Sequence, residues 1–139
     1  MNHTKIDILV SEGLIKDGGI FSPSYVSYKI GTNPHGYEVR RKDADFVFLR
    51  KILLRQFPHL IIPPCVTKSP KLVPLKIKKR ERYYTRFLQA VARCEELKTS
   101  TFLHTFLQEK DLKNFQKASK DADKAKYGRT IEEFVTYRG

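Results

Sequence analysis

Basic residues are concentrated in the middle of this 139-residue chain, between Arg40 and Arg80. Lysine and arginine donate charge-assisted hydrogen bonds to phosphate oxygens, so a dense group of them can bind a phosphorylated ligand. A solvated charge run is the simpler interpretation of such a group, and the residue types alone leave both open. The densest part of the group lies between residues 68 and 82 and contains Lys68, Lys71, Lys76, Lys78, Lys79, Arg80 and Arg82.

Three apolar residues lie among these lysines, namely Val66, Leu72 and Val73. A loop that combines apolar side chains with lysines can enter the interface of an anionic membrane. The same side chains could instead cover the protein core, and the sequence favours neither interpretation. We therefore treat Val66, Lys71, Leu72 and Val73 as a candidate membrane-contact loop.

Residues typical of catalysis and metal binding are scattered. Cys65 and Cys94 lie far apart, without the spacing of a zinc site, and are expected to be reduced thiols. No phosphate-loop, serine hydrolase or zinc protease motif occurs. Asp43 has no evident partner as a general base, so we expect no catalytic residue, no cofactor and no metal. The histidines, which lack ligand or triad spacing, are His3, His35, His59 and His104.

The chain is strongly basic, with 27 Lys and Arg against 15 Asp and Glu and a net charge of +12. Nucleic acid, an anionic membrane and an acidic protein are all partners that such a charge favours. No apolar run approaches the roughly 20 residues of a membrane span, and the N-terminus lacks the apolar core of a signal peptide. Membrane contact is therefore expected to be peripheral.

The first part of the chain predicts a sheet followed by a helix. Strand-like segments at residues 6–10, 24–30 and 37–41 are separated by glycine-containing turns, which indicates an antiparallel meander. Asp43 or Asp45 can then cap a helix that ends before Pro58. The apolar residues at helical spacing in that helix are Phe46, Leu49, Leu53 and Phe57.

The second part of the chain predicts helices. An extended segment at Pro63 and Pro64 is followed by a long helix at about residues 77–97, a short one at 100–107 and another from about Asp111. Strands first and helices after indicate an α+β fold: a three-stranded antiparallel β-meander packed against a helical subdomain of three to four helices. We expect residues 1–116 to form the domain and 117–139 a basic amphipathic tail or linker.

Four pieces of sequence, taken in order, resemble the PX (phox homology) domain, most of all that of sorting nexins. They are residues 37–49 (YEVRRKDADFVFL), residues 61–64 (IIPP), Arg80 seven residues before Phe87, and residues 102–107 (FLHTFL). The similarity spans about residues 6–115. Residues 106–112 (FLQEKDL) further resemble the end of the PX domain in sorting nexins that continue into a BAR domain.

The resemblance implies a basic pocket between sheet and helices for the headgroup of phosphatidylinositol 3-phosphate. Arg41 matches the first arginine of the family's junction motif, and Lys42 matches the arginine that grips the 3-phosphate. Asp43 falls where the family has the aromatic residue that stacks on inositol. Lys68 matches a 1-phosphate contact, and Arg80 the arginine that binds the 4- and 5-hydroxyls. Lysine lacks the bidentate geometry of arginine, and the Asp43 carboxylate repels phosphate, so the pocket is expected to be atypical.

The sequence thus predicts a non-catalytic module of a sorting nexin, with phosphoinositide-binding residues Arg41, Lys42, Lys68 and Arg80. Its partner would be a membrane containing phosphatidylinositol 3-phosphate or another phosphoinositide, reached from the cytoplasm at endosomes. The alternative is a PX scaffold that binds cargo or coat proteins. Nucleic acid is not expected, since helical spacing turns Tyr84 inward, and a dimer is expected only if a BAR domain follows.

Overall fold

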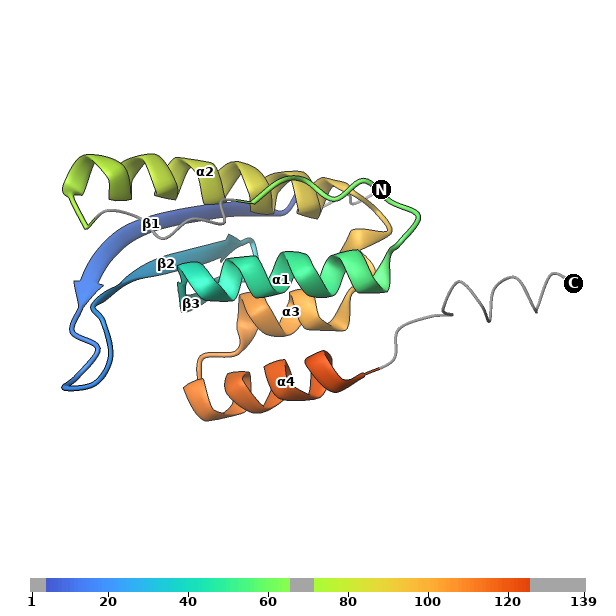
Figure 1. The fold of residues 1–139 in the computed structure, drawn as a ribbon. Helices are drawn as coiled ribbons and strands as arrows, with labels where there is room; N and C mark the ends of the chain where they lie inside the picture. Colours follow the sequence, from blue (N-terminus) through green and yellow to red (C-terminus); the bar gives the residue numbers. More distant parts are fainter. Residues whose placement is uncertain (1–4, 66–71, 126–139) are drawn as a thin grey trace, which may run out of the picture.

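The computed structural model describes residues 5–65 and 72–125 (Figure 1). Three strands, β1 (Asp7–Lys16), β2 (Tyr25–Asn33) and β3 (Tyr37–Lys42), form one antiparallel sheet in the order β1-β2-β3. The helices are α1 (Asp43–Gln56), α2 (Pro74–Arg93), the short 3-10 helix η1 (Leu97–Thr99), α3 (Thr101–Gln108) and α4 (Leu112–Lys124). The predicted α+β fold, a meander packed against helices, is confirmed.

The first strand is longer than the sequence indicated, because a bulge interrupts its alternation. The register between β1 and β2 shifts between Ser11 and Leu14, and Glu12 has a φ of 47°. Gly13 in this bulge lies so close to α2 that an added Cβ would come within 2.5 Å of the Ile77 side chain. The bulge therefore lets α2 approach the strand directly.

Helix α2 lies along the outer edge of β1 (Figure 1). Thr85 Oγ1 accepts a hydrogen bond from the Val10 amide at 3.0 Å, and Gln89 donates to the Ile8 carbonyl at 3.2 Å. Glu81, which is buried, accepts from the Gly13 amide at 2.9 Å. These bonds satisfy backbone groups that would be unpaired on an edge strand.

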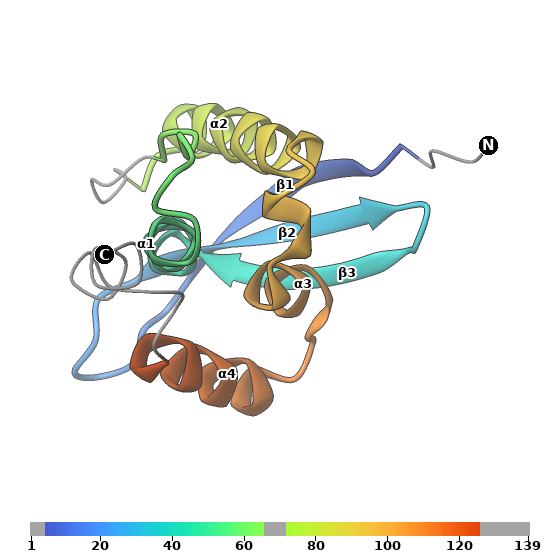
Figure 2. The same cartoon turned by 90° about the vertical axis from the view of Figure 1, so that its right-hand side faces the viewer.

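The core lies between one face of the sheet and the helices that cover it (Figure 2). Tyr28 from β2, Phe46 from α1, Tyr84 from α2 and Phe106 from α3 are all fully buried. The Phe46 and Tyr84 rings stack with centroids 3.8 Å apart, and Tyr28 meets Tyr84 edge-on at 5.3 Å. This aromatic cluster fixes α1, α2 and β2 relative to one another, and its two hydroxyl groups lie at the start of α1.

The helix boundaries differ from the sequence expectation at two places. Helix α2 begins at Pro74, since proline fits the first helical position, and it ends at Arg93, before η1. Helix α4 runs through residue 116, the end of the expected domain, and its Ala122 is still buried. The packed region of the chain therefore continues to Lys124.

Candidate functional site

Asp43 is the centre of a polar cluster at the junction of β3 and α1. Its carboxylate accepts hydrogen bonds from the Tyr84 hydroxyl at 2.5 Å and from the Tyr28 hydroxyl at 3.2 Å. Arg80 Nη1, from α2, donates to the same carboxylate at 3.1 Å. Two distant segments of the chain, β2 and α2, thus converge on one acidic side chain of α1.

This cluster is largely shielded from water. The side chains of Arg80 and Asp43 are 12% and 18% exposed. Burial, reinforced by the Asp43 charge, raises the pKa of the Tyr28 and Tyr84 hydroxyls well above the usual value. Both tyrosines therefore remain protonated donors at neutral pH, and the Arg80 charge has a carboxylate partner within the protein.

The capping role open to Asp43 or Asp45 belongs to Asp45. Asp45 Oδ2 accepts a hydrogen bond from the Lys42 amide at 2.8 Å, which satisfies a backbone donor at the start of α1. Burial raises the pKa of Asp45, and the bond to the Lys42 amide opposes that shift. Because Asp45 caps the helix, the Asp43 carboxylate is available for Arg80.

Arg41 does not lie where its predicted role as a headgroup contact would require. It is 3% exposed, and its guanidinium donates to the carbonyls of Phe106 at 3.0 Å and Glu109 at 2.6 Å. The same group lies 3.7 Å from the centre of the Phe115 ring. Burial lowers the pKa of Arg41 to about 10, which leaves it charged at neutral pH. Arg41 therefore fastens the end of α3 and the start of α4, and we correct its assignment from headgroup contact to structural residue.

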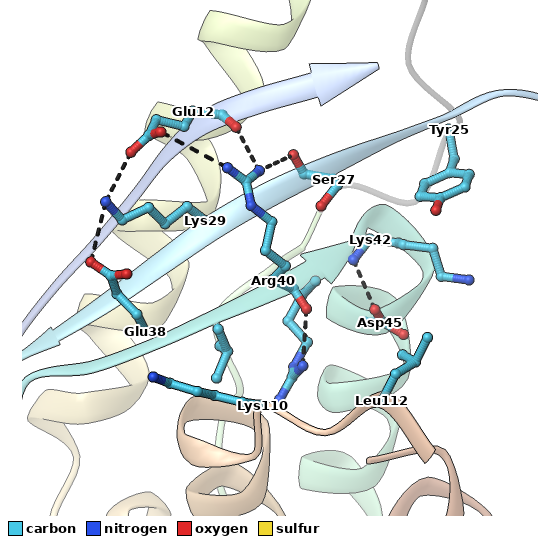
Figure 3. A pocket seen from close by; sticks show the side chains of 12 residues that line it. Glu12, Tyr25, Ser27, Lys29, Glu38, Arg40, Lys42, Asp45, Lys110 and Leu112 are labelled. Atoms are coloured by element: carbon cyan, nitrogen blue, oxygen red, sulfur yellow. Dashed lines mark hydrogen bonds and ion pairs between the residues drawn. The ribbon is translucent and has the colours of Figure 1, made fainter. Parts of the chain in front are cut away.

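Lys42 lines a hollow of about 640 Å³ on the open face of the sheet (Figure 3). Its amine lies 5.3 Å from the centre of the Tyr25 ring. Elsewhere in the hollow, Arg40 donates to the Glu12 and Ser27 carbonyls at 2.8 and 2.9 Å, and Lys29 pairs with Glu12 and Glu38. The structure thus brings Arg80 to Asp43 but places the Lys42 amine beside Tyr25.

The predicted membrane-contact loop is only partly described. Leu72 and Val73 are 38% and 44% exposed at the start of α2, whereas Val66, Lys68 and Lys71 lie outside the described residues. Leu75, in the first turn of α2, is 82% exposed. The sequence analysis did not single out Leu75, which precedes the helix predicted from about residue 77.

A second exposed apolar segment was also missed. Ile20 and Phe21, in the turn between β1 and β2, are 93% and 98% exposed. The sequence did contain a signal for this segment, because two adjacent apolar residues within a turn rich in Gly, Ser and Pro are expected to be exposed. This turn, the start of α1 and the start of α2 all lie at the same end of the molecule, which we call the site end (Figure 1).

Within residues 5–65 and 72–125, no group of three or more His, Cys, Asp or Glu side chains is arranged to hold a metal ion. The helices of this part of the chain also include none that combines the length and apolar character needed to cross a bilayer.

Comparison with known proteins gives one consistent family. The family model described as PX domain matches residues 31–110. Sorting nexin-4 of Eremothecium gossypii is 33% identical over 113 residues, covering 70% of this chain and 28% of the relative. Sorting nexin-4 of Colletotrichum higginsianum is 32% identical over 120 residues, covering 76% and 25%. The chain therefore spans about a quarter of the length of these relatives.

A solved structure gives the same fold. The crystal structure of a designed CISK-PX domain is 24% identical and superposes with a TM-score of 0.63, covering 73% of this chain and 98% of that chain. At this identity, the likeness concerns the fold. The functional residues must be judged from the geometry of this chain.

Proposed function

This chain belongs to the PX domain family, and from that premise we propose that it is a non-catalytic, phosphoinositide-binding module that targets a sorting nexin to endosomal membranes. It would act from the cytoplasm as a peripheral membrane protein in endosomal trafficking. The observation that carries the proposal is the combination of charge and apolar side chains at the site end. Arg80, the arginine that the family pattern assigns to the headgroup, pairs with Asp43 at the start of α1, and the same end has exposed apolar residues in the turn between β1 and β2 and in the first turn of α2.

The apolar segments would provide membrane attachment. Burying a large apolar side chain is worth about 1.5–3 kcal/mol, so Phe21 and Leu75 together can hold the domain at an interface. Lys76, Lys78 and Lys79 follow Leu75 and are exposed. Each basic residue close to an anionic surface adds about 1 kcal/mol. Shallow insertion and charge attraction therefore act at the same end of the molecule.

The headgroup site would be atypical because Asp43 occupies it. A phosphorylated headgroup must compete with the Asp43 carboxylate for Arg80 and is repelled by its charge. Lys42 is exposed and has a flexible stem, so its amine can turn from Tyr25 toward a phosphate at the start of α1. We propose Lys42, Lys68 and Arg80 as the headgroup contacts, with weaker recognition of phosphatidylinositol 3-phosphate than a pocket without Asp43 would give.

Vesicle co-sedimentation tests this function. Vesicles of phosphatidylcholine and phosphatidylserine, carrying each phosphoinositide in turn, are incubated with wild type and with the double variant K42Q/R80Q. A double variant of exposed lysines in the last turns of α4, K120Q/K124Q, removes the same charge at the end of that helix opposite Leu112, which lines the hollow of Lys42. We expect phosphoinositide-dependent binding that K42Q/R80Q weakens at least about tenfold and K120Q/K124Q leaves within about twofold.

Two results would contradict the proposal. Folded wild-type protein that binds no phosphorylated lipid at low salt would remove the lipid function and leave the cargo- or coat-binding scaffold. Equal loss in both double variants would mean attraction by net charge, without a headgroup site. Circular dichroism of each variant shows whether it is folded.

A further inference from the structure

The outer face of α2 carries three exposed arginines that the lipid site does not use. Arg82, Arg86 and Arg93 recur at positions i, i+4 and i+11, which places them on one side of the helix. The buried residues of α2, among them Tyr84, Leu88 and Val91, lie on the opposite side. We call Arg82, Arg86 and Arg93 the arginine ridge.

The described residues form no direct ion pair with this ridge. The ion pairs found in residues 5–65 and 72–125 include none that involves Arg82, Arg86 or Arg93. Glu81, the one acidic residue in the α2 sequence, faces β1 and binds the Gly13 amide. Glu95, shortly after the helix, pairs with Lys98 at 3.0 Å. Like charges at this spacing repel, so a negatively charged partner would reduce the repulsion among the three arginines.

Most of the ridge lies away from the site end. Helix α2 runs from that end toward the opposite end of the molecule (Figure 1). At a rise of 1.5 Å per residue, Arg82, Arg86 and Arg93 lie about 12, 18 and 28 Å along the helix from Pro74, and Arg82 lies only about 3 Å beyond Arg80. The Debye length at physiological ionic strength is about 8 Å. If the site end rests on the bilayer, as proposed above, a membrane attracts Arg86 and Arg93 weakly.

The kind of cation changes along the helix in the same direction. The exposed cations of the first two turns are Lys76, Lys78 and Lys79, and those beyond them are arginines. Lysine attracts an anionic surface as a point charge, whereas the planar guanidinium of arginine binds carboxylates in a bidentate manner. The part of α2 beyond Lys79 thus has the chemistry for individual carboxylates.

We propose that the arginine ridge is a docking surface for an acidic helical segment of a protein partner. Aspartate and glutamate side chains spaced along that segment would pair with Arg82, Arg86 and Arg93, and the exposed ring of Tyr83 would contact its apolar atoms. The lipid site would remain free, so membrane and partner can be bound together. In this proposal, only the orientation of the ridge relative to the membrane rests on the proposed lipid function.

Fluorescence anisotropy with a labelled peptide tests the docking surface directly. The probe is a helical peptide of glutamate and alanine with about 20 residues, which matches the length of α2, and the comparison peptide has glutamine for glutamate. The ridge variant is R82E/R86E/R93E. The matched control, K113E/K117E/K120E, reverses three exposed charges on α4. We expect the ridge variant to bind the acidic peptide at least about tenfold more weakly and the control to stay within about threefold of wild type.

The outcomes separate this proposal from the lipid function, because the peptide titration needs no membrane. Equal weakening in the two triple variants, no binding by wild type, or equal binding of the glutamine peptide would overturn the docking surface. Co-sedimentation with phosphoinositide vesicles is the second readout, where the ridge variant should bind as the control does. A loss of vesicle binding confined to the ridge variant would instead make the ridge a membrane surface and overturn the proposal.

Discussion

At the scale of single residues, Asp43 decides the character of the site. It accepts hydrogen bonds from two buried hydroxyls and pairs with Arg80, so it stabilises the junction of α1, α2 and β2. In the proposed headgroup site, the same carboxylate would repel an incoming phosphate. Under that proposal, stability and ligand affinity depend in opposite ways on its charge.

The variant D43N should separate the two effects. Asparagine keeps an oxygen acceptor for Tyr28 and Tyr84 and removes the negative charge, so we expect affinity for phosphoinositide vesicles to rise about three- to tenfold. Co-sedimentation measures the change. D121N, on the exposed side of α4, removes an equal charge at a distance. A similar gain in both variants would show that net charge alone is responsible.

The sequence predicted which residues were unusual, but not what they contact. The family register identified Lys42 and Asp43 as departures from the PX pattern. It could not place Asp43 against Tyr28, Tyr84 and Arg80, which are 15, 41 and 37 residues away in the chain. Nor could it separate Arg41, which is buried against α3, from exposed Lys42, since adjacent residues of a strand point to opposite faces.

At the scale of the elements, Arg41 joins the sheet to the C-terminal helices. Its guanidinium binds carbonyls at the end of α3, where a helix leaves acceptors unpaired and favours positive charge. The contact with the Phe115 ring extends this connection to α4. A single buried side chain therefore fixes the position of both helices.

Replacing this side chain should destabilise the fold strongly. We expect R41A to lower the free energy of unfolding by about 2–4 kcal/mol, because carbonyls buried at the end of α3 lose their donor. Urea denaturation measures the change. R86A, which removes an exposed arginine of α2, should stay within about 0.5 kcal/mol of wild type. Similar values for the two variants would contradict the structural role of Arg41.

The close approach of α2 to β1 gives a second test at this scale. An added Cβ at Gly13 would meet Ile77 at 2.5 Å and Glu81 at 3.0 Å, so we expect G13A to lower the free energy of unfolding by about 1–3 kcal/mol. Gly31, in β2, has no atom within 4 Å of an added Cβ. G31A should therefore be nearly neutral in the same urea titration, and an equal loss would count against the packing shown here.

The elements were predicted well where their pattern is regular. The three strands, their antiparallel order and the helices follow from alternation, helical spacing and turn residues. The first strand was predicted to end at Val10 because the bulge at Glu12 and Gly13 breaks the alternation before Leu14. Long-range packing of α2 on β1, which local sequence does not contain, allows the strand to continue to Lys16.

At the scale of the whole molecule, the exposed apolar side chains define an orientation. Phe21 and Leu75 come from turns and helices far apart in sequence, yet both belong to the site end. The net charge of +12 indicated an anionic partner without saying which surface would face it. Only the arrangement of the elements shows that apolar and basic groups meet at one end.

Membrane attachment should depend on these side chains in particular. We expect F21S/L75S to weaken vesicle binding about tenfold or more, without loss of stability, because both side chains are exposed in the free protein. I61S is the control, since Ile61 is 98% exposed in the segment that follows the far end of α1. Co-sedimentation and thermal denaturation are measured for both. Binding that falls equally in I61S would argue against the proposed orientation.

The covering of β1 by α2 has a consequence for the behaviour of the protein at high concentration. An open sheet edge is a template on which a strand of another chain can add, and such pairing leads to aggregation. Here Thr85, Gln89 and Glu81 already bind the backbone groups that a foreign strand would need. Helix α2 thus protects the β1 edge of the sheet from strand addition, while its other face, which carries the arginine ridge, stays exposed.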